Sequence, residues 1–321
     1  MADGIPRIVT LTINPALDIA TEAKAVRPTH KIRTSSGNYD PGGGGINVSR
    51  VVHALGASTL AILATGGATG RMIEEMLAQA SVPWKSTPLG GTSRICLTVR
   101  DLSTASEYRF VPEGPTLEPS EWNAVLAGID IGAGDWLVAS GSLPPGVPAD
   151  FYARVARVAA ARGAKFALDT SGPALRATLS QGIDILKLSL GECESIIDHE
   201  IRDLDSQGNQ AMALVRMGAA RMVALTLGPN GAIFATSDGA LRLPAIDIVE
   251  HSAVGAGDSF LAGLVLGLAR GQGPADSLRL ATAAGAAAAA SIGTARVRSA
   301  EVEAMLERMD QPELLPLQPC L

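Results

Sequence analysis

Short runs of β-branched and apolar residues alternate along this chain with longer segments of helical periodicity. The runs that predict strands are Ile8–Ile13, Thr59–Ala64, Trp136–Ala139, Lys165–Leu168, Ile183–Leu186 and Met222–Thr226. The segments that predict helices are Ile46–Leu55, Gly70–Ala80, Glu118–Gly128, Ala149–Ala161, Gly191–Ile197, Gly208–Met217, Gly257–Ala269, Ala275–Ser291 and Ala300–Met309. Such alternation is typical of βαβ units, so it predicts an α/β fold with a parallel sheet covered by helices on both faces. Ligands are then expected outside the carboxyl ends of the strands.

Two segments interrupt this alternation. Residues 19–39 and 92–111 lack a helical period, and the second contains the strand-like stretches Arg94–Val99 and Glu107–Val111. By themselves they predict a small peripheral β-meander. The chain has 321 residues, of which 47% are hydrophobic, and no linker or internal repeat divides it. We therefore expect a single domain over residues 1–321, with the two segments inserted in it.

The segment around Asp258 combines small residues with the start of an apolar helix. Gly255, Ala256 and Gly257 lead directly into that helix. The first N–H groups of a helix lack intrahelical partners, and glycines let a ligand approach them, so this turn predicts an anion site. Asp258 at its mouth has two interpretations. It is either a helix cap or a general base beside a transferred anionic group.

A second glycine cluster lies far upstream. Gly42 to Gly45 precede an amphipathic helix, and Asn47 lies on its first turn. No Gly-Lys-Ser/Thr follows, so the cluster is not a P-loop, and its spacing does not fit the Rossmann fingerprint. The alternative is a turn that needs glycine for its backbone angles. Four consecutive glycines exceed that need and favour a loop that faces a ligand.

Together the two clusters resemble those of the PfkB family of ribokinase-like carbohydrate kinases, and the resemblance covers residues 10 to 299. It rests on both clusters and on the further motifs Thr12-Ile-Asn-Pro-Ala-Leu-Asp18, Ser140-Gly-Ser-Leu-Pro-Pro-Gly146, Asp169-Thr-Ser-Gly172 and Thr226-Leu-Gly-Pro-Asn-Gly231. Within the family the chain is most similar to the 6-phosphofructokinases of the PfkB type, which share the segment Tyr108–Leu117 and a glycine run unbroken by lysine.

The resemblance implies a fold, an activity and an assembly. The fold is a three-layer sandwich, with the two inserted segments forming a small β-sheet lid over the sugar site. The activity is ATP-dependent phosphorylation of fructose 6-phosphate to fructose 1,6-bisphosphate. Tagatose-6-phosphate kinase and 1-phosphofructokinase are alternatives, and a non-catalytic sensor of sugar phosphates or nucleotides is a third. The lids of two subunits are expected to pair in a homodimer.

The resemblance also assigns roles to individual residues. Asp258 is expected to accept the proton of the attacking hydroxyl, while Gly255, Ala256 and Gly257 form the anion hole. The expected sugar contacts are Asp18, Gly43, Gly44, Asn47 and Ser140. The candidates for the phosphate of the sugar are Arg94, Lys31 and Arg33, and the lysine is expected to reach the site of the neighbouring subunit. Arginine suits this task because its guanidinium binds phosphate in a bidentate way.

The residues expected to bind the nucleotide and its metal ion include two departures from the family pattern. The expected contacts are Lys187, Thr226, Gly228, Gly231, Ser252 and Gly257. Glu192 is expected to organise Mg²⁺ through water, with Ser189 as a weaker candidate. Ser189 stands where the family usually has asparagine, and Ala253 where it usually has threonine. The first departure puts the metal affinity in question, and the second a nearby site for a monovalent cation such as K⁺.

Composition excludes several other classes of function. The formal net charge of −6 and an isoelectric point near 5.3 argue against nucleic acid as the main partner. Three scattered cysteines without a C-x-x-C motif indicate neither a disulfide framework nor a zinc site, which fits a cytoplasmic protein. The apolar stretches are too short to span a bilayer, and the first residues lack the features of a signal peptide.

Overall fold

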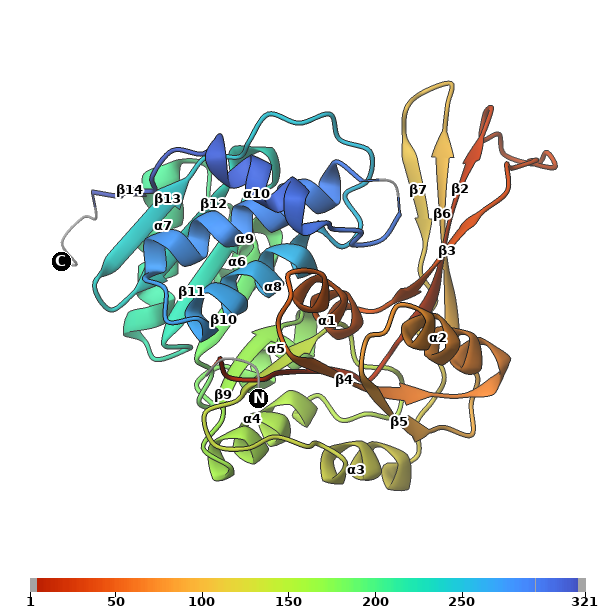
Figure 1. The fold of residues 1–321 in the computed structure, drawn as a ribbon, viewed down its shortest axis with the longest axis horizontal. Coiled ribbons are helices and arrows are strands. Elements are labelled where there is room, and N and C mark those ends of the chain that lie inside the picture. The colour runs from red at the N-terminus through yellow and green to blue at the C-terminus, as the bar shows by residue number, and fades with distance from the viewer. Residues whose placement is uncertain (1–4, 292, 317–321) are drawn as a thin grey trace.

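A ten-stranded sheet, in which parallel pairing dominates, runs through the body of the protein (Figure 1). The computed structural model describes residues 5–291 and 293–316. The strands lie in the order β14 (Glu313–Leu314), β13 (Gly239–Leu243), β12 (Ala232–Thr236), β11 (Met222–Thr226), β10 (Ile185–Ser189), β9 (Lys165–Asp169), β8 (Trp136–Ser140), β1 (Ile8–Thr12), β4 (Thr59–Thr65) and β5 (Trp84–Pro88). The seven neighbouring strands β5, β4, β1, β8, β9, β10 and β11 are parallel to one another. The pairs β11–β12, β12–β13 and β13–β14 are antiparallel.

Helices cover both faces of this sheet, as the alternation predicts. One face carries α3 (Pro119–Ala127), α4 (Phe151–Ala161), α5 (Gly172–Thr178), α6 (Leu190–Ile197) and α7 (Leu204–Arg216). The other carries α1 (Gly44–Ala54), α8 (Ala256–Ala269), α9 (Pro274–Ala289) and α10 (Ser299–Glu307). In strand β1, Val9 and Leu11 pack into the core on the α3–α7 face and Ile8 into the core on the opposite face, because successive side chains of a strand point to opposite faces. No helix in the described part of the chain is both long and apolar enough to cross a membrane.

Helices α8 and α9 pack closely because small residues line their contact. A Cβ atom added at Gly263 would lie 2.6 Å from the carbonyl oxygen of Leu280 and 2.8 Å from the Cα atom of Ala281. One added at Gly267 would lie 2.8 Å from the Cα atom of Ser277. The alanine-rich sequence of α9 therefore serves close helix packing.

A second sheet of four strands projects from the body as a lid (Figure 1). Its order is β3 (Asn38–Gly42), β2 (Ala16–Ala23), β6 (Arg94–Asp101) and β7 (Glu107–Phe110). Two of these strands extend beyond the expected segment of residues 19–39, since β2 starts at Ala16 and β3 ends at Gly42. Leu17 at the base of β2 packs with Ile46 of α1 and with α2 (Gly67–Gln79), so the base of the lid is part of a buried cluster.

The two faces of the lid differ in polarity. Asp18 is aligned with Asp40 on one side and with Cys96 on the other, so these side chains share one face. The next row runs across all four strands and is apolar, and it lies on the opposite face. Its members are Tyr39, Ile19, Leu97 and Phe110. Phe110 is 56% exposed and Tyr39 is 47% exposed, which leaves an apolar surface on the outer lid face.

Most of the predicted elements are confirmed, with ends shifted by a few residues. The structure adds helix α5 and strands β5 and β12 to β14, which the sequence pattern did not predict. Helix α5 has only seven residues, too few to establish a period. Strands β12 and β13 form a hairpin after the last parallel strand, where the βαβ alternation no longer holds.

The contact between α8 and α9 generates a stability prediction. Gly263→Ala places a methyl group against the backbone of α9 and is expected to lower the free energy of unfolding by about 1–3 kcal/mol, as overpacking does. Gly191 is the matched control, because it also lies within a helix but a Cβ atom there meets nothing within 4 Å. Gly191→Ala is expected to be neutral or stabilising. Urea denaturation of both variants measures the difference, and equal stabilities would contradict the packing argument.

Candidate active site

The first turn of α8 presents the carboxylate of Asp258 to two other parts of the body. Asn47 of α1 donates its Nδ2 to Asp258 Oδ2 at 2.9 Å, and Ser140 at the end of β8 donates its Oγ to Asp258 Oδ1 at 3.1 Å. Gly255 precedes the helix with φ 80°, a left-handed backbone angle that favours glycine. Both carboxylate oxygens are thus held by side chains outside α8, which argues against a role confined to capping.

The upstream glycine run meets this carboxylate, because its lack of side chains leaves room for the polar groups. A Cβ atom at Gly44 would lie 1.9 Å from Ser140 Oγ and 2.8 Å from Asp258 Oδ1. One at Gly42 would lie 2.2 Å from the carboxylate of Asp18. Gly43 has φ 115° and forms the N-cap of α1. The tertiary structure therefore requires small residues at these positions for two reasons, backbone angle and close approach.

A buried ion pair lies on the other side of the α8 turn. Lys187 Nζ donates to Asp169 Oδ2 at 3.0 Å, and the same ammonium would lie 3.0 Å from a Cβ atom added at Gly257. Burial disfavours the charge of Lys187, but the carboxylates of Asp169, Glu192 and Asp258 outweigh it and raise the pKa of the ammonium. The lysine therefore stays charged beside the glycine turn. This places a cation and helix N–H groups together, as an anion site requires.

Asp169 begins one of the motifs that carry the family resemblance, but it is not among the predicted site residues. Burial raises its pKa to about 6, against the attraction of Lys187, and the charges of Asp258 and Glu192 add to the rise. Its position at the carboxyl end of β9 was the available signal, since ligands bind at that edge of a parallel sheet.

Ser189 and Glu192 form a capping box at the start of α6. Glu192 Oε2 accepts from the backbone N–H of Ser189 at 2.7 Å, and Ser189 Oγ accepts from the N–H of Glu192 at 3.3 Å. Among the described residues no group of three His, Cys, Asp or Glu side chains is placed to hold a metal. Mg²⁺ in phosphotransfer sites uses one or two carboxylates, waters and substrate phosphates, so Glu192 fits that manner of binding.

A cavity of about 500 Å³ lies next to the glycine turn of α8. Its lining residues include the predicted positions Thr226, Gly228, Gly231, Ala256 and Gly257. Ser252 was also predicted here, and its hydroxyl accepts a hydrogen bond from the N–H of Val254 at 3.2 Å. The walls are mostly small or apolar, with Phe260 and Thr282 facing the same space. An apolar group in this cavity, joined to an anionic group beside Gly257 and Lys187, would match the character of these residues.

Asp18, one of the expected sugar contacts, lies on the lid. It is within β2, and the glycine at position 42 lets its carboxylate lie against β3. Burial raises the pKa of Asp18 to about 6; a hydrogen bond from the Thr294 side chain lowers it, Asp40 raises it further, and Arg109 and Arg94 lower it. A carboxylate held in this way is a strong acceptor for hydroxyl groups.

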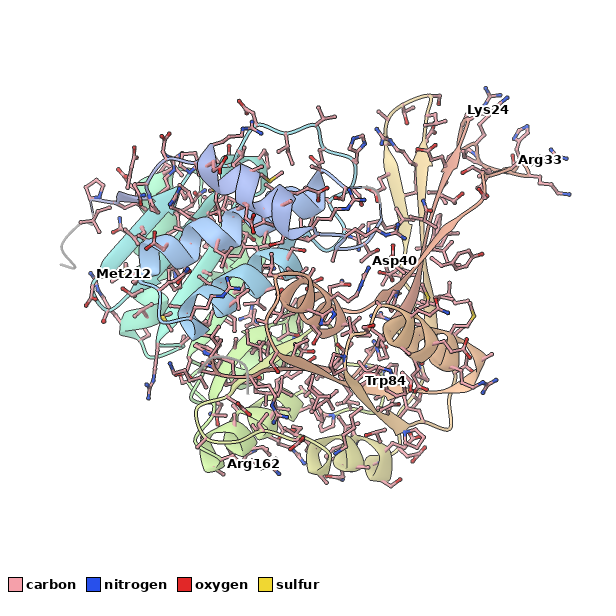
Figure 2. The ribbon with its side chains drawn as sticks, viewed as in Figure 1. Lys24, Arg33, Asp40, Trp84, Arg162 and Met212 are labelled. Carbon is pink, nitrogen blue, oxygen red and sulfur yellow. The ribbon has the colours of Figure 1, made fainter. Side chains whose placement is uncertain are left out.

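The predicted phosphate-binding cations are spread over the lid. Arg94 Nη1 donates to the carbonyl oxygen of Pro112 at 2.8 Å and its Nη2 to that of Asn14 at 3.1 Å, while its Nε is buried without a partner. Lys31 and Arg33 are exposed, and Figure 2 shows Arg33 at the far end of the lid, pointing away from the body. Within one chain these two residues therefore do not join Asp258. Arg109, which the sequence did not single out, acts electrostatically on Asp18 from β7.

The fold and this arrangement define a sugar kinase, and the comparison with known sequences assigns the family. The chain belongs to the pfkB family of carbohydrate kinases, which its residues 12–300 match. It is 41% identical to the ATP-dependent 6-phosphofructokinase isozyme 2 of Mycobacterium tuberculosis over 312 residues, which are 97% of this chain and 92% of that protein.

Solved structures show the same similarity. Phosphofructokinase-2 from Escherichia coli in complex with fructose-6-phosphate superposes with a TM-score of 0.89 at 32% identity, over 95% of this chain and 99% of that one. The same enzyme in complex with potassium gives a TM-score of 0.90 at 33% identity, with the same coverage.

The environment of Asp18 predicts a pH-dependent stability. Because its pKa rises from 3.8 to about 6 on folding, the folded state holds the proton more tightly, and stability attributable to Asp18 falls as pH rises between these values. Asp18→Asn removes this loss. Its stability relative to the wild type is expected to grow by about 2 kcal/mol between about pH 4 and about pH 7. Urea denaturation across that range measures it, and a constant difference would contradict the shifted pKa.

Proposed function

We propose that this protein is an ATP-dependent 6-phosphofructokinase, which converts fructose 6-phosphate and ATP to fructose 1,6-bisphosphate and ADP. The observation that carries the proposal is the position of Asp258. Its carboxylate is held by Asn47 and Ser140 at the N-terminus of α8, and the neighbouring Gly257 lines the cavity of about 500 Å³. The similarity to enzymes of this activity supports the same substrate.

The proposed reaction uses the carboxylate of Asp258 as a base and the glycine turn of α8 as an anion site. The sugar, held by Asp18, Gly43, Gly44 and Asn47, presents its free primary hydroxyl to Asp258. That oxygen attacks the γ-phosphorus of ATP while its proton passes to the Asp258 carboxylate, and the bond to the ADP oxygen breaks. The N–H groups of Gly255, Ala256 and Gly257, together with Lys187, stabilise the negative charge on the transferred group.

Cations complete the nucleotide side. Mg²⁺ would be held by Glu192 through water and by the phosphates of ATP, and when bound it neutralises charge on the β- and γ-phosphates. Ser189 uses its hydroxyl in the helix cap, so we assign it no direct metal contact. A monovalent cation such as K⁺ is proposed near the turn at Ala253, in line with the potassium complex of the E. coli enzyme.

A phosphorylated sugar suits the charge of the lid. Arg94 and Arg109 both lower the pKa of Asp18 electrostatically, so a substrate bound beside Asp18 would experience the positive charge of two guanidinium groups. Charged donors of this kind suit a phosphate better than a neutral sugar. Tagatose 6-phosphate differs from fructose 6-phosphate in the configuration of one hydroxyl, whereas fructose 1-phosphate carries its phosphate at the opposite end of the sugar. Both remain the alternative substrates.

We also propose that two subunits pair through their lids. The apolar row with Tyr39 and Phe110 lies on the outer lid face, where exposure to water is unfavourable. An isologous contact of two such faces buries both rows. Lys31 and Arg33, which do not reach the site of their own chain, would then be available to that of the partner.

The activity is tested by coupled ADP release with fructose 6-phosphate, fructose 1-phosphate, tagatose 6-phosphate, fructose and ribose. Fructose 6-phosphate is expected to give the highest kcat/KM. Asp258→Asn should reduce turnover by about 10²–10⁴-fold, the usual effect of losing a general base. Asp276→Asn is the matched control, because Asp276 also lies in the first turn of a helix, but in α9.

Two results would overturn the proposal. An unphosphorylated sugar as the best substrate would exclude a phosphosugar kinase. Equal turnover in Asp258→Asn and Asp276→Asn would remove Asp258 from the chemistry.

The lid contact is tested with Phe110→Glu, which places a charge in the apolar row. The variant is expected to sediment as a monomer at concentrations where the wild type is a dimer, and its sugar KM should rise because the partner's Lys31 is lost. Val249→Glu is the control, since Val249 is also an exposed apolar residue but lies outside the lid, with 75% of its surface accessible. A fully active wild-type monomer in sedimentation at assay concentration would rule out the lid dimer.

A further inference from the structure

Asp40 is a buried carboxylate that the proposed chemistry does not use. It lies on β3 beside Asp18 and is 4% exposed. Arg50 Nη2 from α1 donates to its Oδ1 at 3.1 Å, and Arg296 Nε donates to the same oxygen at 3.1 Å. The backbone N–H of Thr294 donates to Oδ2 at 3.1 Å. The lid, α1 and the segment before α10 therefore meet at one charge, at the junction seen in Figure 2.

The segment of residues 293–296 contacts both ends of the site. The side chain of Thr294 lies beside the carboxylate of Asp18, on the proposed sugar side, where it lowers the pKa of that carboxyl. The N–H of Ala295 donates to the carbonyl of Val254 at 3.4 Å. A Cβ atom added at Gly255 would lie 2.7 Å from the Cβ atom of Ala295, so this segment supports the glycine turn of α8 directly.

The backbone of this segment is held in an unfavourable conformation. Ala295 has φ 46°, which is uncommon for a residue with a side chain. Gly293 has φ 107°, and a Cβ atom there would lie 2.8 Å from Asp40 Oδ2. Such conformations persist where the surrounding structure holds them. Asp40 provides that hold through the N–H of Thr294, and Arg50 adds a second contact by donating Nη1 to the carbonyl of Thr294 at 2.8 Å.

We infer that Asp40 is a positioning residue for the phosphotransfer reaction. Its carboxylate, joined to Arg50 and Arg296, fixes the segment of residues 293–296 so that Thr294 orients Asp18 and Ala295 supports the anion hole at Gly255. One buried ionic group thus sets the position of the sugar end and of the phosphoryl end together. The inference rests on the proposed roles of Asp18 and Gly255.

The test compares Asp40→Asn with Asp101→Asn. Asp101 is the matched control, since it is also a lid aspartate, 2% exposed, but accepts hydrogen bonds from Val26 and Ser103 within the lid. Asp40→Asn is expected to lower kcat/KM for fructose 6-phosphate by about 10²-fold, the effect of misplacing reacting groups by about 1 Å. The loss should fall on kcat and on the sugar KM, with the KM for ATP nearly unchanged. Asp40→Glu should recover part of it.

Hydrogen–deuterium exchange without substrate gives a readout besides activity. In Asp40→Asn, exchange should accelerate in peptides covering residues 293–298 and 254–257, and in Asp101→Asn it should accelerate within the lid alone. Arg296→Met, which removes one donor at a half-exposed position, should show a smaller change in the same two peptides and serves if Asp40→Asn does not fold.

Identical kinetics and exchange in the Asp40 and Asp101 variants would overturn the inference. A wild type that phosphorylates no sugar phosphate would refute the proposed function instead, and the exchange experiment would still decide whether Asp40 holds the segment.

Discussion

The carboxylate of Asp258 is the point on which the rest of the site depends. It is held from two sides, by Asn47 of α1 and Ser140 of β8, while its own helix supplies the N–H groups of the glycine turn. These contacts need strand ends and helix starts to converge at one edge of a parallel sheet, which the βαβ order provides. They also need Gly44, because a methyl group there would overlap Ser140 Oγ. The hydrogen bonds to Asp258 therefore depend both on the fold and on the run of glycines.

Buried charge is the second constraint. Asp169 and Lys187 are removed from water and paired, and the ammonium remains charged because three carboxylates surround it. A buried pair of this kind contributes little net stability, since desolvation offsets the attraction. What it supplies is a fixed cation beside Gly257, where we propose that the transferred phosphate binds without reorganisation of the site. The buried carboxylate of Asp40 likewise has a positioning role at the base of the lid, where it holds the strained segment of residues 293–296 in place.

The lid joins two functions in one small sheet because its strands alternate. The face with Asp18 is the one proposed to bind the sugar, and the face with Tyr39 and Phe110 is apolar and accessible. A four-stranded sheet has too little core of its own to bury its outer face, and a second copy is the cover that we propose for it. Substrate binding and assembly would then be linked through the same strands.

The sequence by itself determined the local elements and the two glycine turns, because periodicity and glycine content depend on neighbours along the chain. It placed six parallel strands and nine helices, and it singled out Asp258, Asn47 and Ser140. Only the tertiary structure decided which groups meet. It places Asp18 on the lid and leaves Lys31 and Arg33 outside the site of their own chain. It also brings Asp40 into contact with Arg296, which lies 256 positions later in the sequence. No local pattern records such contacts, because an ion pair between distant residues depends on how strands and helices pack.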